Sequence, residues 1–97
     1  MIELCNLRKE KPSNPWDVKV DRSSPLGNPF HSGSRNYVCD QYEQAFEDRV
    51  RLNLTKYAEL QRLLIIHKQY GKLRLFCWCT PLRCHSETIK SFLEQRI

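Results

Sequence analysis

The stretch LRLFCWCTPLRCHSETIKSFL, residues 73–93, decides the fold that we predict. Residues 73–77 form an apolar run that is typical of a buried strand. Further on, Ile89, Phe92 and Leu93 stand at helical spacing, so a helix with one apolar face follows the strand after a short loop. Ligands of open α/β sheets bind beyond the carboxyl ends of the strands. The loop between this strand and this helix is therefore the first candidate for a functional site.

Two further helices are predicted between the long N-terminal segment and this strand. Ser34 can cap the first helix, Thr55 can cap the second, and Gly71 stands where the second should end. Apolar residues three and four positions apart give each helix one buried stripe. These residues are Val38, Tyr42, Ala45, Phe46 and Val50 in the first helix, and Tyr57, Leu60, Leu63, Leu64 and His67 in the second.

The beginning of the chain supplies the remaining strands. Residues 2–7 are predicted to form an opening strand, and residues 17–20 a short alternating one. Strands that are joined through helices pair in parallel, with right-handed crossovers. We therefore predict an α/β fold in a small single domain over residues 1–97, with a short, mostly parallel sheet of about three strands and about three helices.

The composition limits the classes of protein to consider. A chain of 97 residues has room for one modest core and no second domain. It has no apolar run long enough to cross a bilayer and no signal peptide at its start, so we expect a cytoplasmic protein without a membrane partner. Five cysteines, three of them within residues 77–84, indicate reduced thiols rather than a disulfide framework. The net charge of +5 favours an anionic partner, although it also serves solubility alone.

A long loop at about residues 9–35 is rich in proline and glycine and contains the short strand. Loops of this length inside a small domain are usually functional or mobile, so we expect a functional loop. Its positive charge would help to hold a phosphate-bearing ligand, and a solvated basic loop explains the charge equally well. The basic residues are Lys9, Lys11, Lys19, Arg22 and Arg35, and His31 is a weaker candidate beside them.

The segment CWCTPLRCH, residues 77–85, allows four interpretations. In the first, Cys77, Cys79, Cys84 and His85 supply the four ligands of a tetrahedral zinc site, with unusual spacing. In the second, Cys84 is a reactive thiol at a helix start that also attracts anions, and His85 moves its proton. In the third, Cys77 and Arg83 form the Cys-x5-Arg loop of cysteine-dependent phosphatases, although no glycine lies between them. In the fourth, the cysteines are small core residues.

Several of these residues together resemble a known family. The segment PLGNPF, residues 25–30, is followed at a distance by residues 71–73 and then by Cys-Trp-Cys, Pro81 and Cys84-His85. Over about residues 17–96, the chain resembles the domain of unknown function 4326 family, whose members are small phage and bacterial proteins. The resemblance implies a phage or prophage origin and a site made by two loops, and it brings no established activity. Ser86 stands where this family usually has glycine.

The resemblance also names the positions of the two loops. They are Gly27, Asn28, Pro29 and Phe30 in the first, and Cys77, Cys79, Pro81, Cys84 and His85 in the second. Gly27 and Asn28 suit a turn with positive φ, and Asn28 can offer both a donor and an acceptor to a base or a sugar. The alternative is an ordinary tight turn whose Phe30 fills the core.

We therefore predict a phage-type protein that binds or acts on a nucleotide or a nucleic-acid phosphate. The predicted ligand-binding residues are Gly27, Asn28, Phe30, Cys79, Arg83 and Ser86, with Cys84, His85 and Cys77 as candidate catalytic groups. A second hypothesis is a zinc-stabilised module that binds a host protein in the host cytoplasm, and a third is a cysteine-dependent phosphatase-like enzyme. Whether the chain is an enzyme stays open at this point.

Overall fold

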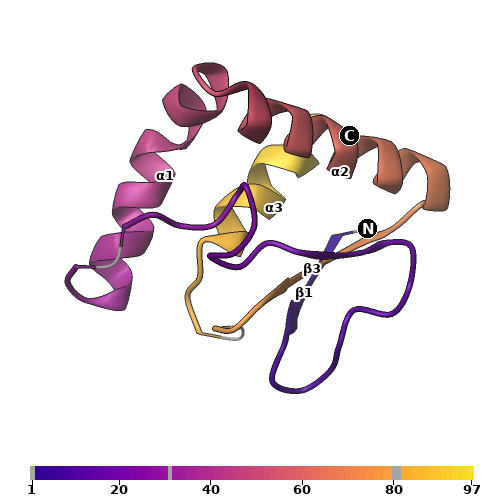
Figure 1. Cartoon of the computed structure of the whole chain (residues 1–97), viewed down its shortest axis with the longest axis horizontal. Coiled ribbons are helices and arrows are strands. Elements are labelled where there is room, and N and C mark those ends of the chain that lie inside the picture. Colours follow the sequence, from indigo (N-terminus) through magenta and orange to yellow (C-terminus); the bar gives the residue numbers. More distant parts are fainter. Residues whose placement is uncertain (1, 31, 80–81) are drawn as a thin grey trace.

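The computed structural model describes residues 2–30, 32–79 and 82–97 (Figure 1). Along the chain, the elements are β1 (Ile2–Asn6), β2 (Asp17–Lys19), α1 (Arg35–Arg51), α2 (Leu54–Tyr70), β3 (Leu73–Cys77) and α3 (Ser86–Glu94). This is the predicted order of strands and helices. No helix in the described part of the chain is long and apolar enough to span a membrane.

β3 is the central strand of the sheet, whose order is β1-β3-β2. Both neighbours run parallel to it, with Leu4 of β1 and Val18 of β2 in register with Leu75. Parallel strands need a crossover connection, and the pair of helices α1 and α2 provides it between β2 and β3. For the described residues, the predicted α/β fold with a three-stranded parallel sheet and three helices is confirmed.

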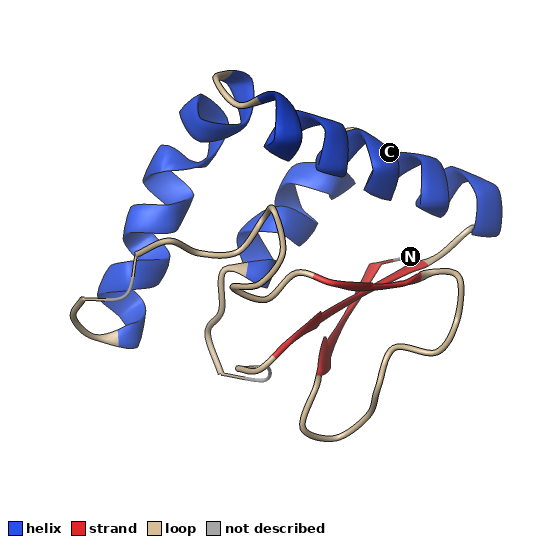
Figure 2. Cartoon of the chain, in the orientation of Figure 1, coloured by secondary structure: helices blue, strands red, loops and turns tan. Residues whose placement is uncertain are grey.

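The helices and the sheet form two layers with the core between them. Figure 2 shows all three helices on one side of the sheet and the connection from β1 to β2 on the other side. The side chains that fill the interlayer core include Leu60, Leu63, Leu73, Leu75, Ile89 and Leu93, none more than 1% exposed. Complete burial of such a side chain stabilises a protein by about 1.5–3 kcal/mol. This packing holds the first turns of α1 and α3 close to the carboxyl ends of the strands.

The ends of the helices show which sequence signals the fold uses. Ser34 caps α1 as predicted, since its hydroxyl accepts from the Tyr37 N–H at 3.2 Å. Asn53, not Thr55, caps α2, because its side-chain oxygen accepts from the Lys56 N–H at 3.1 Å. Gly71 ends α2 as predicted, with φ of 73°, a left-handed conformation that favours glycine.

The first half of the predicted long loop is tied to the open face of the sheet. The Arg74 guanidinium on β3 pairs with Glu10 and with Asp17, the latter at 3.5 Å. The Asp17 carboxylate also accepts from the backbone N–H groups of Ser13 and Asn14, both at 3.0 Å. These contacts fix the connection between β1 and β2, and the segment that follows β2 is the part of the long loop that remains to form a site.

Candidate functional site

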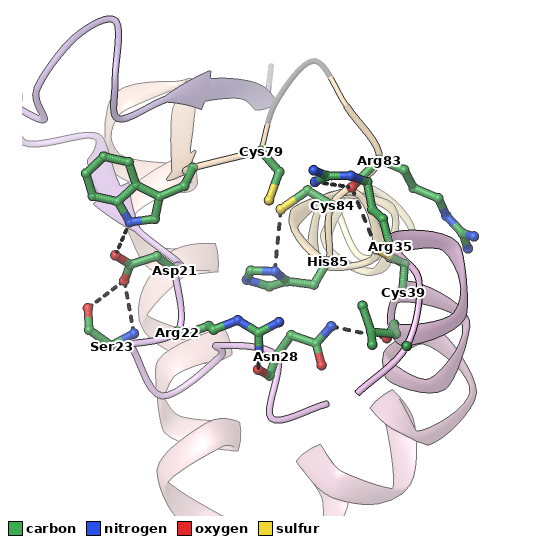
Figure 3. A pocket seen from close by; sticks show the side chains of 13 residues that line it. Asp21, Arg22, Ser23, Asn28, Arg35, Cys39, Cys79, Arg83, Cys84 and His85 are labelled. Atoms are coloured by element: carbon green, nitrogen blue, oxygen red, sulfur yellow. Dashed lines mark hydrogen bonds between the residues drawn. The ribbon is translucent and has the colours of Figure 1, made fainter. Parts of the chain in front are cut away.

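A pocket of about 540 Å³ opens at the carboxyl ends of β2 and β3 (Figure 3). Its walls come from the segments that follow these two strands, from the start of α1 and from the residues that begin α3. The lining residues are Asp21, Arg22, Ser23, Asn28, Gly33, Arg35, Val38, Cys39, Trp78, Cys79, Arg83, Cys84 and His85. The two predicted loops therefore meet at one pocket, where Asn28 comes from the first, and Cys79, Arg83, Cys84 and His85 come from the second.

The first loop builds the pocket wall through Asn28, a residue that is 4% exposed. Its amide N–H donates to the Val38 carbonyl at 3.1 Å, and its amide oxygen accepts from the Phe30 N–H at 2.9 Å. Both functional groups are used within the protein, so this geometry does not present the amide to a base or a sugar. Asn28 instead ties the loop to the first turns of α1.

The positive φ predicted for Gly27 and Asn28 is wrong, because among the described residues only Gly33 and Gly71 have a positive φ. Gly27 is required for a different physical reason, which is close approach. A Cβ at this position would lie 2.5 Å from the Arg22 Cα and 2.6 Å from the Asp21 carbonyl oxygen. The loop therefore crosses directly over the backbone that carries Asp21 and Arg22 into the pocket.

Four of the predicted site residues do not line the pocket and have structural roles in this fold. Besides Gly27, Phe30 packs against the hydrophobic core. Cys77 and Ser86 are at most 1% exposed, and the thiol and the hydroxyl are 3.4 Å apart. A phosphatase nucleophile must face its substrate, so the geometry gives no support to Cys77 in that role.

Three arginines reach the pocket, and they differ in their charge partners. The Arg83 guanidinium pairs with Asp40 of α1 at 2.7 Å, and it also contacts the Glu43 carboxylate. The Arg22 guanidinium donates to the carbonyls of Asn28 and Phe30. Neither Arg22 nor Arg35 forms an ion pair with a carboxylate of the described residues. Arg83 therefore ties the second loop to α1, and Arg22 and Arg35 leave net positive charge at the pocket.

The Arg35 guanidinium lies against the second loop, where it donates to the Arg83 carbonyl at 3.5 Å. The start of α3 contributes less positive potential than the sequence indicated. The Cys84 N–H, two residues before α3 begins, donates to the side-chain carboxylate of Glu87 in the first turn at 3.0 Å. Glu87 thus occupies part of the anion-binding helix start, and the two arginines are the main source of positive charge.

On the opposite side of the pocket, Asp21 and Trp78 form a hydrogen-bonded pair. The indole N–H of Trp78 donates to the Asp21 carboxylate at 3.0 Å, and the Ser23 N–H donates to the other carboxylate oxygen at 3.2 Å. Burial acts to raise the pKa of Asp21, but the hydrogen bonds from Ser23 and Trp78 outweigh burial and lower that pKa. Asp21 is therefore ionised at neutral pH and fixes the indole ring.

Cys84 and His85 form a thiol–imidazole pair at the centre of the site. The Cys84 Sγ lies 3.4 Å from the His85 Nδ1, and the His85 Nε2 contacts the Val20 carbonyl, which can only accept. Nε2 therefore carries the proton and Nδ1 is the acceptor for the thiol. Burial lowers the pKa of His85, while contact with the Cys77 thiol and burial raise the pKa of Cys84. The pair is therefore neutral at neutral pH.

The four predicted zinc ligands do not form a metal site in this structure. The described residues contain no group of three or more histidine, cysteine, aspartate or glutamate side chains arranged to hold a metal ion. His85 uses both ring nitrogens within the protein, and Cys77 lies behind the pocket wall. Zinc binding stays a prediction that this arrangement does not support. Pro81 and His31 lie outside the described residues.

Sequence reasoning missed several residues that line the pocket. Asp21 and Trp78 are 57 positions apart, and nothing local signals their hydrogen bond. Cys39 of α1 is buried, and it also lines the pocket. Arg22 and Arg35 were noted as positive charge near the site, and their position directly after a strand and at a helix start could have singled them out.

Comparison with known proteins identifies the family of this chain but no function. No curated protein and no solved structure is significantly similar to it. The match that is found covers residues 5–95, which include both loops of the pocket and all three helices. The chain belongs to the family described as Domain of unknown function (DUF4326).

Proposed function

We propose that the pocket binds a phosphate-bearing ligand of the nucleotide or nucleic-acid class. The observation that carries this proposal is the pair Arg22 and Arg35, which come from separate segments, line the same pocket and have no ion-pair partner among the described carboxylates. Guanidinium groups form bidentate, charge-assisted hydrogen bonds with phosphate. Asp21 is the ionised carboxylate of the same lining, and a phosphate placed between the two arginines would neutralise the positive charge that remains.

The position and the charge of the site support the same class of ligand. The pocket lies beyond the carboxyl ends of two parallel strands, where α/β proteins commonly bind nucleotides. Its volume of about 540 Å³ is in the range of small-molecule sites. The net charge of +5 adds attraction for an anion, and this long-range contribution weakens as salt is added.

The test measures binding of nucleoside monophosphates, ribose phosphate, inorganic phosphate and a short single-stranded oligonucleotide by calorimetry at low and high salt. We expect binding that weakens with salt and that falls about tenfold or more in Arg22→Gln and Arg35→Gln, since charged hydrogen bonds contribute about 1.5–3 kcal/mol. Arg51→Gln is the matched control, because it removes the same charge from the far end of α1, where Arg51 pairs with Asp48. The proposal fails if none of these ligands binds at low salt, or if all three variants behave alike.

The zinc-stabilised module that binds a host protein is the alternative, and it makes a different prediction. It requires about one zinc ion per chain and unfolding when the metal is chelated. Metal analysis of protein that was purified without chelator, together with Cys79→Ala and Cys84→Ala, tests it. A folded, metal-free chain would count against it.

A further inference from the structure

The pocket has two chemically different sides, and the arginines account for only one of them. Figure 3 shows Asp21 on one side of His85, and Cys39 with the backbone of α1 on the other. Trp78 lies on the Asp21 side, since its indole N–H donates to the Asp21 carboxylate. Trp78 takes no part in the anion site that Arg22 and Arg35 form. The residue is 49% exposed, although it lines a pocket and its indole N–H is hydrogen-bonded to a buried carboxylate. The combination of an exposed tryptophan and a fixed ring orientation therefore needs a physical explanation.

The indole orientation is set from both ends of the residue. The ring N–H is held by Asp21, which is 6% exposed and is itself held by Ser23. The Trp78 carbonyl accepts from the Asn6 side-chain amide at 3.4 Å. A ring that is held by its polar edge cannot turn into the core, so one face stays available at the pocket.

The second tryptophan of the chain makes a useful comparison, because its ring is already covered. The Trp16 ring lies 5.7 Å from the Tyr70 ring, between centroids, and the Lys72 ammonium lies 4.0 Å from its centroid. Trp78 has no such aromatic or cationic neighbour among the residues that the structure describes. Its open face therefore has the shape and polarity to take a planar ring from a ligand.

We infer that the ligand is a mononucleotide, with its base stacked on Trp78 and its phosphate held by Arg22 and Arg35. This inference rests on the proposed function and narrows it from phosphate-bearing ligands in general. Stacking on an aromatic side chain is available to every base, and the fixed indole loses no rotational freedom on binding. A concave pocket of about 540 Å³ encloses one nucleotide, whereas a polymer needs a groove along which its backbone can continue.

The chain offers a direct reporter of this contact, because it contains only two tryptophans. In the Trp16→Phe variant, Trp78 is the only source of indole fluorescence. A stacked base quenches this fluorescence, and ribose phosphate, which has no aromatic ring, does not. We expect saturable quenching by nucleoside monophosphates, and binding of ribose phosphate in calorimetry without quenching.

A second variant measures how much the ring contributes. In Trp78→Leu, nucleotide affinity should fall roughly 5- to 150-fold, the factor that corresponds to a stacking contribution of about 1–3 kcal/mol. Ribose phosphate affinity should stay within about twofold, because stacking does not contribute to it. Trp78→Phe keeps a stacking ring and should recover most of the affinity, which separates loss of stacking from misfolding.

The outcomes distinguish the two proposals. Nucleotide and ribose phosphate binding with equal affinity, or equal losses for both in Trp78→Leu, would overturn the base-stacking assignment and leave the phosphate site standing. Tighter binding of an oligonucleotide than of every mononucleotide would overturn the mononucleotide assignment. If no phosphate-bearing compound binds, the proposed function fails first and this inference fails with it.

Discussion

Replacement of Gly27 by alanine tests whether the first loop is a structural crossing rather than a ligand contact. The added Cβ would lie 2.5 Å from the Arg22 Cα, 2.6 Å from the Asp21 carbonyl oxygen and 2.9 Å from the Arg22 carbonyl carbon. All three neighbours are backbone atoms, so no side chain can rotate away and one of the two segments must shift. Overpacking of this kind costs about 1–3 kcal/mol, and here the backbone contacts place the expected loss of unfolding free energy at the upper end, about 3 kcal/mol.

Urea denaturation, followed by circular dichroism, measures this loss as a change in the free energy of unfolding. The matched control is Gly71→Ala, whose Cβ would meet nothing within 4 Å and would be disfavoured only by the φ of +73°. This strain costs about 1–2 kcal/mol. The steric argument is refuted if Gly27→Ala is as stable as the unmodified chain, or clearly more stable than Gly71→Ala.

Three further predictions concern the pocket wall and its central pair. Asn28→Ala should lower the free energy of unfolding by about 1–3 kcal/mol, since it removes the hydrogen bond to the Val38 carbonyl and leaves the Phe30 N–H without its partner; a loss below about 0.5 kcal/mol in urea denaturation would contradict it. Burial lowers the pKa of His85, so stability should be complete above the ordinary histidine value of about 6.5 and fall as the pH drops below it. His85→Gln should flatten this dependence more than His67→Gln does, although burial also lowers the pKa of His67; an unchanged pH profile in His85→Gln would refute the assignment. Iodoacetamide at neutral pH should modify the half-buried Cys79 before Cys84, because Cys84 is 3% exposed and its pKa is raised; mass spectrometry that finds Cys84 modified first would indicate an activated thiol.

The sequence predicts the architecture because the elements are set by local signals. The apolar run of β3 and the helical spacing after it identify a strand followed by a helix, and parallel pairing follows from the connections. Local signals fail where two of them compete. Asn53 and Thr55 can both cap α2, and the choice of Asn53 extends the helix by two residues. Tyr57, expected on the buried stripe, is 52% exposed as a result of how the helix lies over the sheet.

The pocket could be located from the sequence, but the roles of its residues could not. Strand ends mark the place where the two loops meet, and Asn28, Cys79 and Cys84 all reach it. What each side chain does depends on partners far away along the chain. The Asn28 amide N–H donates to the Val38 carbonyl, and the Arg83 guanidinium pairs with a carboxylate of α1. Both side chains are therefore already occupied within the protein. Only the folded structure shows which polar groups are already satisfied.

The residues that carry the resemblance to the family and the residues that face the proposed ligand are largely different. Gly27 and Asn28 hold the loop against its neighbours, and Cys77 is packed beneath the pocket, so substitution of any of them should disturb the fold and ligand binding together. Arg35 is exposed and contributes little to the core, so its substitution should change binding at nearly constant stability. Trp78 is exposed as well, and its substitution removes in addition one hydrogen bond to the buried Asp21. In such a site, the exposed residues that contact the ligand can be substituted while the pocket keeps its shape. Comparing stability with binding for these two groups of variants therefore measures directly which residues build the pocket and which ones use it.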